Sequence, residues 1–484
     1  MFSLLLVSVF VALMVGIGIW GMKKTKSLND FFLGGRSIGP WMSAIAFGTS
    51  YFSAVVFIGF AGKLGWGFGL NVLWIAVGNA VLGCGLSWIV LASRMRRMSQ
   101  NLDVMTLPEF LHERFGSGYL KILSAVIIFI FLLPYSASIF KGLGHLFEMT
   151  FHIPYIWALV AMIGITGIYL VLGGYFAITL TDFIQGIIMI IGSILMIAVL
   201  LDKAGGFFQA LGNITENYTV HMPAGKRPGT LMLISLVFMT SFGTWGLPQM
   251  VQKFYAVKSH KVIRSAAVIT TIFALVVVSA AYFNGALSHL FYDTPPTANG
   301  IINFDLIIPG LLTSQLPETL MAVILLLILS ASMSTLSSLV LVSASSIAID
   351  LYKGHINPQI SPKRSLTLMR LLSGLFIIIS FLIALYQFNV IVTLMSLSWG
   401  AVAGSFMAAI FYGLFWKGTT KAGIYSGIIT GLTTSIVLFF VLGPANSPIA
   451  SSLAMIIPFA VIPAVSAFTP RPPQEILDKA FGNS

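Results

Sequence analysis

Hydroxyl side chains are concentrated at residues 331–338, Ala-Ser-Met-Ser-Thr-Leu-Ser-Ser, inside a run that is otherwise apolar from about residue 320 to 349. Ser334, Ser337 and Ser338 lie at helical spacings i, i+3 and i+4, so they share one face of a helix, with Thr335 beside it. Hard oxygen ligands of this kind suit a small hard cation. The same residues would also let two membrane helices pack closely, and this stretch alone does not decide between the two uses.

A second polar stretch, Gly-Thr-Ser-Tyr-Phe-Ser at residues 48–53, lies midway along another apolar run. Glycine and hydroxyl residues at this depth favour a broken helix, because freed backbone carbonyls are tolerated in a membrane where they line a cavity. Transporters place such breaks near the midplane to hold ions and substrate. A glycine-mediated packing face is the alternative.

Two ionisable residues lie at or inside apolar runs. Asp182 opens the run that follows Gly173-Gly174, where it is either a helix N-cap or a cation ligand or gate, since charge near the membrane interior is costly and usually functional. Lys141 lies about one and a half turns before the outer end of its run. It either snorkels to the interface or counters a substrate carboxylate, with Tyr135 lining the same cavity.

A third polar stretch, Gly-Thr-Trp-Gly-Leu-Pro-Gln at residues 243–249, ends another apolar run, and its proline removes a backbone hydrogen bond there. We expect the substrate to contact side chains of these polar stretches and of the run that carries Lys141. The predicted substrate-binding residues are Ser50, Tyr51, Ser53, Tyr135, Lys141, Thr244, Trp245 and Pro248.

Composition identifies the elements that must position these residues. Of 484 residues, 57% are hydrophobic and 8% are charged, against roughly 25% charged in soluble proteins, so we predict an all-α polytopic membrane protein. The net charge of +12 comes from short loops between apolar runs, which indicates membrane topology and not nucleic-acid binding. The single cysteine, Cys84, lies in a predicted span, so no internal disulfide is possible. Neither a phosphate-binding glycine loop nor paired metal-ligand histidines indicate an enzyme.

Apolar runs of about 20 residues predict thirteen spans. Most of the 26 Lys and Arg residues fall in loops that this count assigns to one side, which predicts the N-terminus outside and the C-terminus in the cytoplasm. The first run is followed, not preceded, by basic residues, so we read it as a retained span and not a signal peptide. The outer segments 202–229 and 291–317 have room for short surface helices. The spans are 2–22, 40–62, 69–93, 119–147, 154–175, 181–201, 230–250, 262–290, 318–348, 366–386, 390–415, 421–441 and 447–468.

Several short motifs, taken in order along nearly the whole chain, resemble the sodium/solute symporter family. They are Asp-Phe-Phe-Leu-Gly-Gly-Arg-Ser-Ile-Gly-Pro at 30–40, Gly173-Gly174 with Thr181-Asp182 and Gln185, Gly246 with Pro248, Met-Ser-Thr-Leu-Ser at 333–337, and Asp350-Leu351-Tyr352. The chain looks closest to the sodium/proline and sodium/pantothenate branches. It departs from the proline branch at Tyr51, which replaces an aspartate, at Thr240, which replaces a tryptophan, and at Lys141, which replaces an apolar residue.

The resemblance implies one membrane domain with a LeuT-type core of two inverted five-helix repeats, at 39–201 and 230–415, followed by two C-terminal helices at 421–468. It also implies a sodium site and, in some members, a second one. The main site would use backbone carbonyls of Thr49, Phe52 and Ala331 and the hydroxyls of Ser334 and Thr335. The second would use Asp182, Ser334, Ser337 and Ser338.

We therefore expect a sodium-coupled secondary active symporter of the cell (inner) membrane, with Na⁺ as the coupling ion and the lipid bilayer around it. Its solute would be an amino acid such as proline, or a carboxylate such as pantothenate or a monocarboxylate. Tyr51 and Lys141 make the predicted cavity less acidic and favour a substrate with net negative charge. A proton-coupled carrier, in which Lys141 or Asp182 titrates, and a solute-responsive channel or sensor are the alternatives. The oligomeric state does not follow from the sequence.

Overall fold

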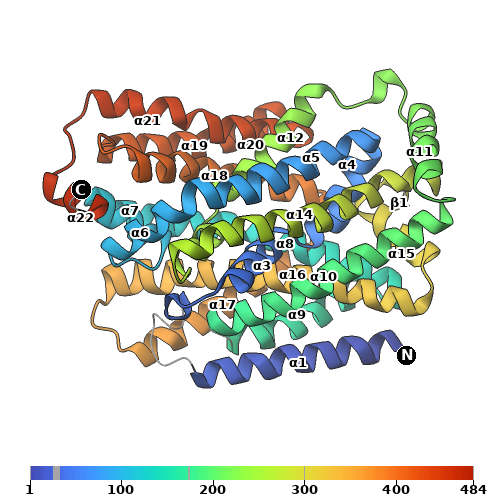
Figure 1. The fold of residues 1–484 in the computed structure, drawn as a ribbon, viewed down its shortest axis with the longest axis horizontal. Coiled ribbons are helices and arrows are strands. Elements are labelled where there is room, and N and C mark those ends of the chain that lie inside the picture. The colour runs from blue at the N-terminus through green and yellow to red at the C-terminus, as the bar shows by residue number, and fades with distance from the viewer. Residues whose placement is uncertain (1, 25–32, 173–174, 299, 483–484) are drawn as a thin grey trace.

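The computed structural model describes residues 2–24, 33–172, 175–298 and 300–482; the motif residues 30–32 and 173–174 lie outside these ranges. The long helices run roughly side by side in one bundle (Figure 1). Helices α11 (Phe207–His221) and α15 (Ile307–Gln315) lie at one end, where the N-terminus also lies. Helices α6 (Ser93–Asn101), α7 (Leu107–Phe115) and α22 (Gln474–Phe481) lie at the other end with the C-terminus. We call these the α15 end and the α7 end.

Within the described residues the secondary structure is helical apart from one short antiparallel hairpin, β1 (Thr297–Ala298) and β2 (Ile301–Ile302), at the α15 end. The predicted outer segments both carry short helices, α11 and α15. The remaining α-helices are α1 (Phe2–Lys24), α3 (Pro40–Tyr51), α4 (Ala61–Phe68), α5 (Leu73–Gly78), α8 (Gly118–Phe151), α9 (Tyr155–Leu172), α10 (Tyr175–Lys203), α12 (Thr230–Phe242), α13 (Pro248–Tyr255), α14 (His260–Leu287), α16 (Glu318–Ser345), α17 (Pro362–Leu385), α18 (Ile391–Phe415), α19 (Lys421–Leu442), α20 (Ser447–Ile456) and α21 (Pro458–Ala467).

Ten helical segments of the described residues are long and apolar enough to cross a membrane, or up to eleven if the bent pair Thr230–Trp245 and Pro248–Tyr255 forms one span. The predicted number of thirteen is therefore not confirmed. The run Val55–Asn101 is one continuous segment of 47 residues that contains the end of the predicted span 40–62 and the whole of the predicted span 69–93. Gly69, at the junction of α4 and α5, has a left-handed φ of 53°. The predicted span 154–175 corresponds to α9.

Two spans are broken near the middle of the bundle. Helix α3 ends at Tyr51, Phe52 is extended (φ −103°, ψ 113°), and a π-helical turn, η2 (Val55–Phe60), resumes the span. This is the break that the glycine and hydroxyl residues at 48–53 predict. The second break follows α12, where η7 (Gly243–Trp245) and extended Leu247 precede α13, and the two limbs differ in direction by 42°. Pro248 begins α13 because its fixed φ suits the first turn of a helix, where its missing N–H is not needed.

Burial separates a central pair of helices from a periphery. In the most apolar window of α18, 89% of residues are buried, and the corresponding value for α16 with its π-helical extension η10 (Ser346–Ile356) is 78%. The value falls to 28% for α1 and α19, whose apolar side chains therefore face the lipid. The hydroxyl-rich stretch of α16 thus lies inside the bundle, beside α3, α8 and α10. The repeat bounds 39–201 and 230–415 remain predictions, and each contains one broken span.

Candidate cation and substrate site

The first break and the hydroxyl-rich helix α16 meet in one cluster of oxygen atoms. Ser334 Oγ lies 2.9 Å from the carbonyl oxygen of Thr49 and 3.0 Å from that of Ala331. Thr335 Oγ1 lies 3.2 Å and 3.1 Å from the same two carbonyls. Because α3 ends at Tyr51, the Thr49 carbonyl is left without a helical N–H donor. The structure thus gathers four of the five predicted sodium ligands, all fully buried.

The Thr49 carbonyl is the acceptor in this cluster that has lost its helical donor, because α3 ends two residues later. The carbonyls of Ala331 and of Ser330, which lies 3.0 Å from Ser334 Oγ, belong to the continuous helix α16 and also accept its backbone N–H groups. Each hydroxyl that donates its hydrogen keeps its lone pairs, so the cluster still presents several oxygen lone pairs in a buried volume. That donor set fits a small hard cation such as sodium. The fifth predicted ligand, the carbonyl of Phe52, follows the end of α3 in extended backbone and stays a prediction.

Hydroxyls on either side of the cluster join the broken span to α16. Ser332 Oγ accepts the backbone N–H of Ala54 at 3.2 Å, and Ser338 Oγ lies 2.9 Å from Ser50 Oγ. The hydroxyls of α16 therefore also hold it closely against the first broken span, which is the helix-packing role that the sequence left open. The two uses are compatible because the outer hydroxyls bind the helices together while the central ones meet the freed carbonyl of Thr49.

Asp182 does not hydrogen-bond to the serines of the predicted second cation site. It lies inside α10 and not at its start, so the N-cap prediction is wrong. Its fully buried Oδ2 is 3.0 Å from Nζ of Lys253 on α13, and its Oδ1 has no hydrogen-bond partner. Ser337 Oγ donates to the carbonyl of Ser334 at 2.9 Å, and Ser338 pairs with Ser50 as described. A cation bound by Asp182 would have to compete with the Lys253 ammonium.

Two of the predicted substrate-binding residues come together around Trp399 of α18. The Tyr51 ring stacks on the Trp399 ring, and the Tyr135 ring meets it edge-on, each with centroids 5.9 Å apart. The Tyr51 hydroxyl donates to the carbonyl of Thr240. All three rings are almost fully buried, and Trp399 Nε1 has no hydrogen-bond partner. Aromatic faces with an unused N–H donor beside a helix break can bind a small solute with polar and apolar parts.

The other predicted substrate-binding residues lie at the breaks but already have protein partners. Thr244 Oγ1 is 3.0 Å from the carbonyl of Gly83, and Trp245 Nε1 donates to the carbonyl of Leu82 at 3.1 Å. Ser53 Oγ accepts the backbone N–H of Val55 at 3.3 Å. Their polar atoms therefore hold the two breaks in place in this conformation. Pro248 contributes the start of α13, and Ser50 faces α16.

Lys141 is buried at the α15 end, where its Nζ lies 2.8 Å from Asp305 Oδ2 and donates to the carbonyl of Asn389 at 2.9 Å. Asp305, in η9 (Phe304–Leu306), also accepts the backbone N–H of Ile391 at 3.2 Å, where α18 begins. Snorkelling is therefore wrong, because the ammonium is enclosed by protein. The structure also places a protein carboxylate where the sequence put a substrate carboxylate.

The α7 end carries a second buried group of charges. Lys121 Nζ lies 3.6 Å from Glu109 Oε1 and 3.7 Å from Asp350 Oδ1, and Thr106 Oγ1 donates to the same Asp350 oxygen at 2.8 Å. Arg114 anchors α7 to the end of α18 through the carbonyls of Gly413 and Trp416. Burial lowers the pKa of its guanidinium to about 10, so it remains charged at neutral pH.

Sequence reasoning missed Trp399, Lys253 and Asp305. Trp399 is one apolar residue in an apolar run, so nothing in the sequence distinguishes it. Asp305 lies in the predicted outer segment 291–317, which contains no Lys or Arg. An unpaired aspartate there and an isolated lysine at 141 together could have suggested the ion pair.

The chain matches known proteins over most of its length. The model of the Sodium:solute symporter family matches residues 31–431. A sodium/proline symporter of Staphylococcus aureus (strain bovine RF122 / ET3-1) is 30% identical over 447 residues, covering 87% of this chain and 83% of that protein. Sodium/proline symporter 2 of Staphylococcus saprophyticus is 30% identical over 440 residues, covering 87% and 82%.

Solved structures show the same fold. A Na⁺-coupled sialic acid symporter in a substrate-bound, outward-open state aligns with a TM-score of 0.79 at 18% identity, over 98% of this chain and 99% of that one. Mhp1, a nucleobase-cation-symport-1 family transporter, aligns with a TM-score of 0.58 at 15% identity, over 93% and 98%. Two broken spans in a helical bundle, with an oxygen cluster at the first break, thus define a polytopic membrane transporter of LeuT-type fold. The chain belongs to the sodium:solute symporter family.

Proposed function

We propose that this protein is a secondary active symporter that couples the uptake of a small organic solute to sodium. The observation that carries the proposal is the oxygen cluster, in which the freed carbonyl of Thr49 faces the carbonyl of Ala331 and the hydroxyls of Ser334 and Thr335. Sodium needs several oxygens to replace its water shell, and two helices that meet at a break supply them. Membership of the sodium:solute symporter family supports sodium as the coupling ion.

The proposed orientation places the α15 end outside and the α7 end in the cytoplasm. Basic residues support it: the outer segment 291–317 contains none, whereas α6 and α7 carry Arg94, Arg96, Arg97 and Arg114. In this orientation the ion pair of Lys141 and Asp305 closes the route from outside. The charges around Asp350 close the route to the cytoplasm, and alternating access opens one end at a time.

For the solute, we favour a small zwitterion of the amino-acid class. The broken first span presents the negative end of α3, while α13 begins at the second break with its positive end, so opposite partial charges border the centre. The face of the Tyr135 ring, which meets Trp399 edge-on, can attract an ammonium group. The relatives named sodium/proline symporters support the same class. Asp305 neutralises Lys141, so the Lys141 ammonium no longer favours a substrate with net negative charge.

A second cation site at Asp182, Ser334, Ser337 and Ser338 is kept as a subordinate proposal. It is supported by the buried Asp182 Oδ1, which has no hydrogen-bond donor. This site requires either that Lys253 moves away from Asp182 or that the Lys253 ammonium and a sodium ion share the Asp182 carboxylate. Sodium stoichiometry would distinguish these cases.

The proposal is tested by uptake into proteoliposomes with an inward sodium gradient, and with sodium replaced by choline at pH 6 and pH 8. Sodium-driven accumulation that is lost in choline at both pH values is expected. Uptake in choline that follows a proton gradient would identify a proton-coupled carrier. Solute flux that never exceeds equilibrium in any ion gradient would identify a channel.

The solute class is tested by competition against the accumulated substrate with L-proline, prolinamide, pantothenate and lactate. A zwitterion is expected to compete best, because its ammonium and carboxylate match the two helix ends. Stronger competition by pantothenate or lactate than by any amino acid would refute the zwitterion proposal while leaving sodium coupling intact.

A further inference from the structure

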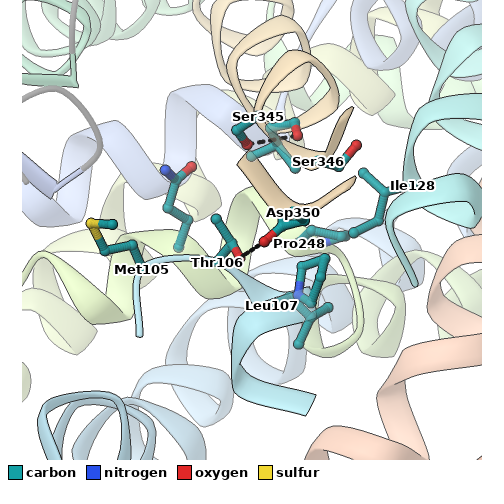
Figure 2. A pocket seen from close by; sticks show the side chains of 11 residues that line it. Met105, Thr106, Leu107, Ile128, Pro248, Ser345, Ser346 and Asp350 are labelled. Atoms are coloured by element: carbon teal, nitrogen blue, oxygen red, sulfur yellow. Dashed lines mark hydrogen bonds between the residues drawn. The ribbon is translucent and has the colours of Figure 1, made fainter. Parts of the chain in front are cut away.

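A small cavity of about 10 Å³ lies where the N-terminal ends of α7 and α13 meet the end of α16, and Figure 2 shows the side chains that line it. Thr106, the N-cap residue of α7, and Pro248, the first residue of α13, border it on one side. Ser345 at the end of α16 and Ser346 and Asp350 of η10 also border it. These last three residues lie roughly 15–22 Å beyond Thr335 along the same helical run, at about 1.5 Å per residue. A volume of this size is enough for one particle the size of water.

One oxygen at this cavity has no donor. Asp350 is 1% exposed; its Oδ1 accepts from Thr106 and faces Lys121, but its Oδ2 has no hydrogen-bond partner. A buried carboxylate oxygen without a donor is costly, so it needs a partner that the described side chains do not provide. Figure 2 shows Asp350 beside Ser345 and Ser346, with Thr106 bonded to it from the opposite side.

The charges of the side chains around this cavity also favour a bound cation. Around Lys121 there are two carboxylates, Glu109 and Asp350, so the group carries one excess negative charge. His355, which faces the Asp350 carbonyl through Nδ1, does not bond to the carboxylate. Arg36 is directed to Ser99 and the carbonyl of Val104. A monovalent cation at Oδ2 would complete the balance.

The neighbouring hydroxyls can act as further ligands. Ser345 Oγ donates to the carbonyl of Val342 at 2.9 Å, and Ser346 Oγ donates to that of Ser343 at 2.8 Å. A hydroxyl that donates its hydrogen keeps its lone pairs, so both oxygens are able to accept a cation. Carboxylate and hydroxyl oxygens are the ligands that a hard monovalent cation prefers.

The geometry points to a binding site for sodium at Asp350 Oδ2, with Ser345 and Ser346, through which the ion leaves the main cluster for the cytoplasm. This inference rests on the proposed sodium coupling, and it adds a second sodium-binding site on the route by which the ion is released. A site on that route lowers the sodium concentration at which the cytoplasmic face binds the ion, and it leaves binding from the outer face unchanged.

The test measures half-saturating sodium from each face separately, with ²²Na⁺ exchange in right-side-out and inside-out proteoliposomes. Asp350→Asn keeps the size of the side chain and an acceptor for Thr106 but removes the charge. It should raise half-saturating sodium about tenfold or more at the cytoplasmic face and less than twofold at the outer face. Ser346→Ala should raise half-saturating sodium by a smaller factor, about two- to fivefold, at the same face. This variant still tests the site if the aspartate variant does not fold.

Glu113→Gln is the matched control, because it removes a carboxylate at the same end, where Glu113 pairs with Lys479 at 2.8 Å on the surface. It should leave both faces unchanged. Unchanged values in Asp350→Asn and Ser346→Ala, as water alone in the cavity would give, or equal changes at both faces, would overturn the inference. Ser334→Ala/Thr335→Ala serves as the separate check on sodium coupling. If it leaves sodium dependence unchanged at both faces, the proposed function fails, whatever Asp350 does.

Discussion

The ion pair of Lys141 and Asp305 is expected to hold the α15 end closed. It joins α8 to η9, and the same aspartate accepts the backbone N–H of Ile391 at the start of α18. The side chains are 4% and 0% exposed, so the pair is shielded from water in this conformation. When this end opens, water can reach both groups, and losing one partner then costs little. Removal of one partner should therefore destabilise the closed conformation selectively.

The size of the effect follows from burial. Lys141→Met leaves the Asp305 carboxylate buried with one backbone N–H, and breaking a buried pair in this way costs about 3–5 kcal/mol. At about 1.4 kcal/mol per tenfold change, the closed-to-open equilibrium should move by a factor on the order of 10² to 10³. The double variant Lys141→Met/Asp305→Leu removes both charges, so most of the shift should be reversed.

The assay uses a reporter cysteine. Cys84 is buried, so Cys84→Ser gives a background in which Ala54→Cys, at the residue immediately before the resumed helix and packed near Gly142, is the single thiol. A membrane-impermeant maleimide added outside should label it at least tenfold faster in the Lys141→Met variant than in the parent, and at close to the parent rate in the double variant. Equal rates in all three would refute the closing role of the pair. A double variant labelled as fast as the single one would refute the electrostatic reason.

Three further predictions concern the ion and the solute. Ser334→Ala/Thr335→Ala should raise the sodium concentration for half-maximal uptake at least tenfold, because two of the ligand oxygens are lost; normal sodium dependence in a well-expressed double variant would disprove the cluster as the main site. Lys253→Met should free Asp182 for a cation and raise the Hill coefficient for sodium from near one toward two, and adding Asp182→Asn should return it to one; a constant value through the series would exclude the second site. Lys141→Met should leave the ratio of proline to prolinamide competition within about twofold of the parent, and a selective loss of carboxylate recognition would restore Lys141 to the substrate site.

The break in the first span could be predicted from local chemistry. Glycine and hydroxyl residues at 48–53 lower helix stability in a membrane, and the hydroxyls at 331–338 are the densest set of side-chain oxygens in their run. That these two stretches meet was implied by the family resemblance, since nothing local in either sequence specifies contact across the intervening residues. The number of spans was harder to predict, because a run such as Val55–Asn101 stays helical through a turn at Gly69.

The partners of the buried charges could not be read from the sequence. Lys141 and Asp305, and likewise Asp182 and Lys253, are far apart in the chain, and periodicity reports which face of a helix is apolar but not which helix lies opposite. Each residue was therefore interpreted alone, as a ligand or a snorkelling side chain. The cost of an unpaired buried charge shows that a partner must exist, but only the packing identifies it.

In the proposed alternating-access cycle, these pairs would connect parts of the chain that move relative to each other. Lys141 and Asp305 join α8 to η9, which contacts the resumed part of the first broken span. Asp182 and Lys253 join α10 to α13, the second limb of the other broken span. Each pair is stable only while its surroundings exclude water, so opening an end and hydrating its pair are one event. A half-broken pair leaves one charge buried at a cost of about 3–5 kcal/mol, so each pair favours a fully buried or a fully hydrated state over an intermediate one. Coupling requires such discrete states, because sodium could otherwise leak through without the solute.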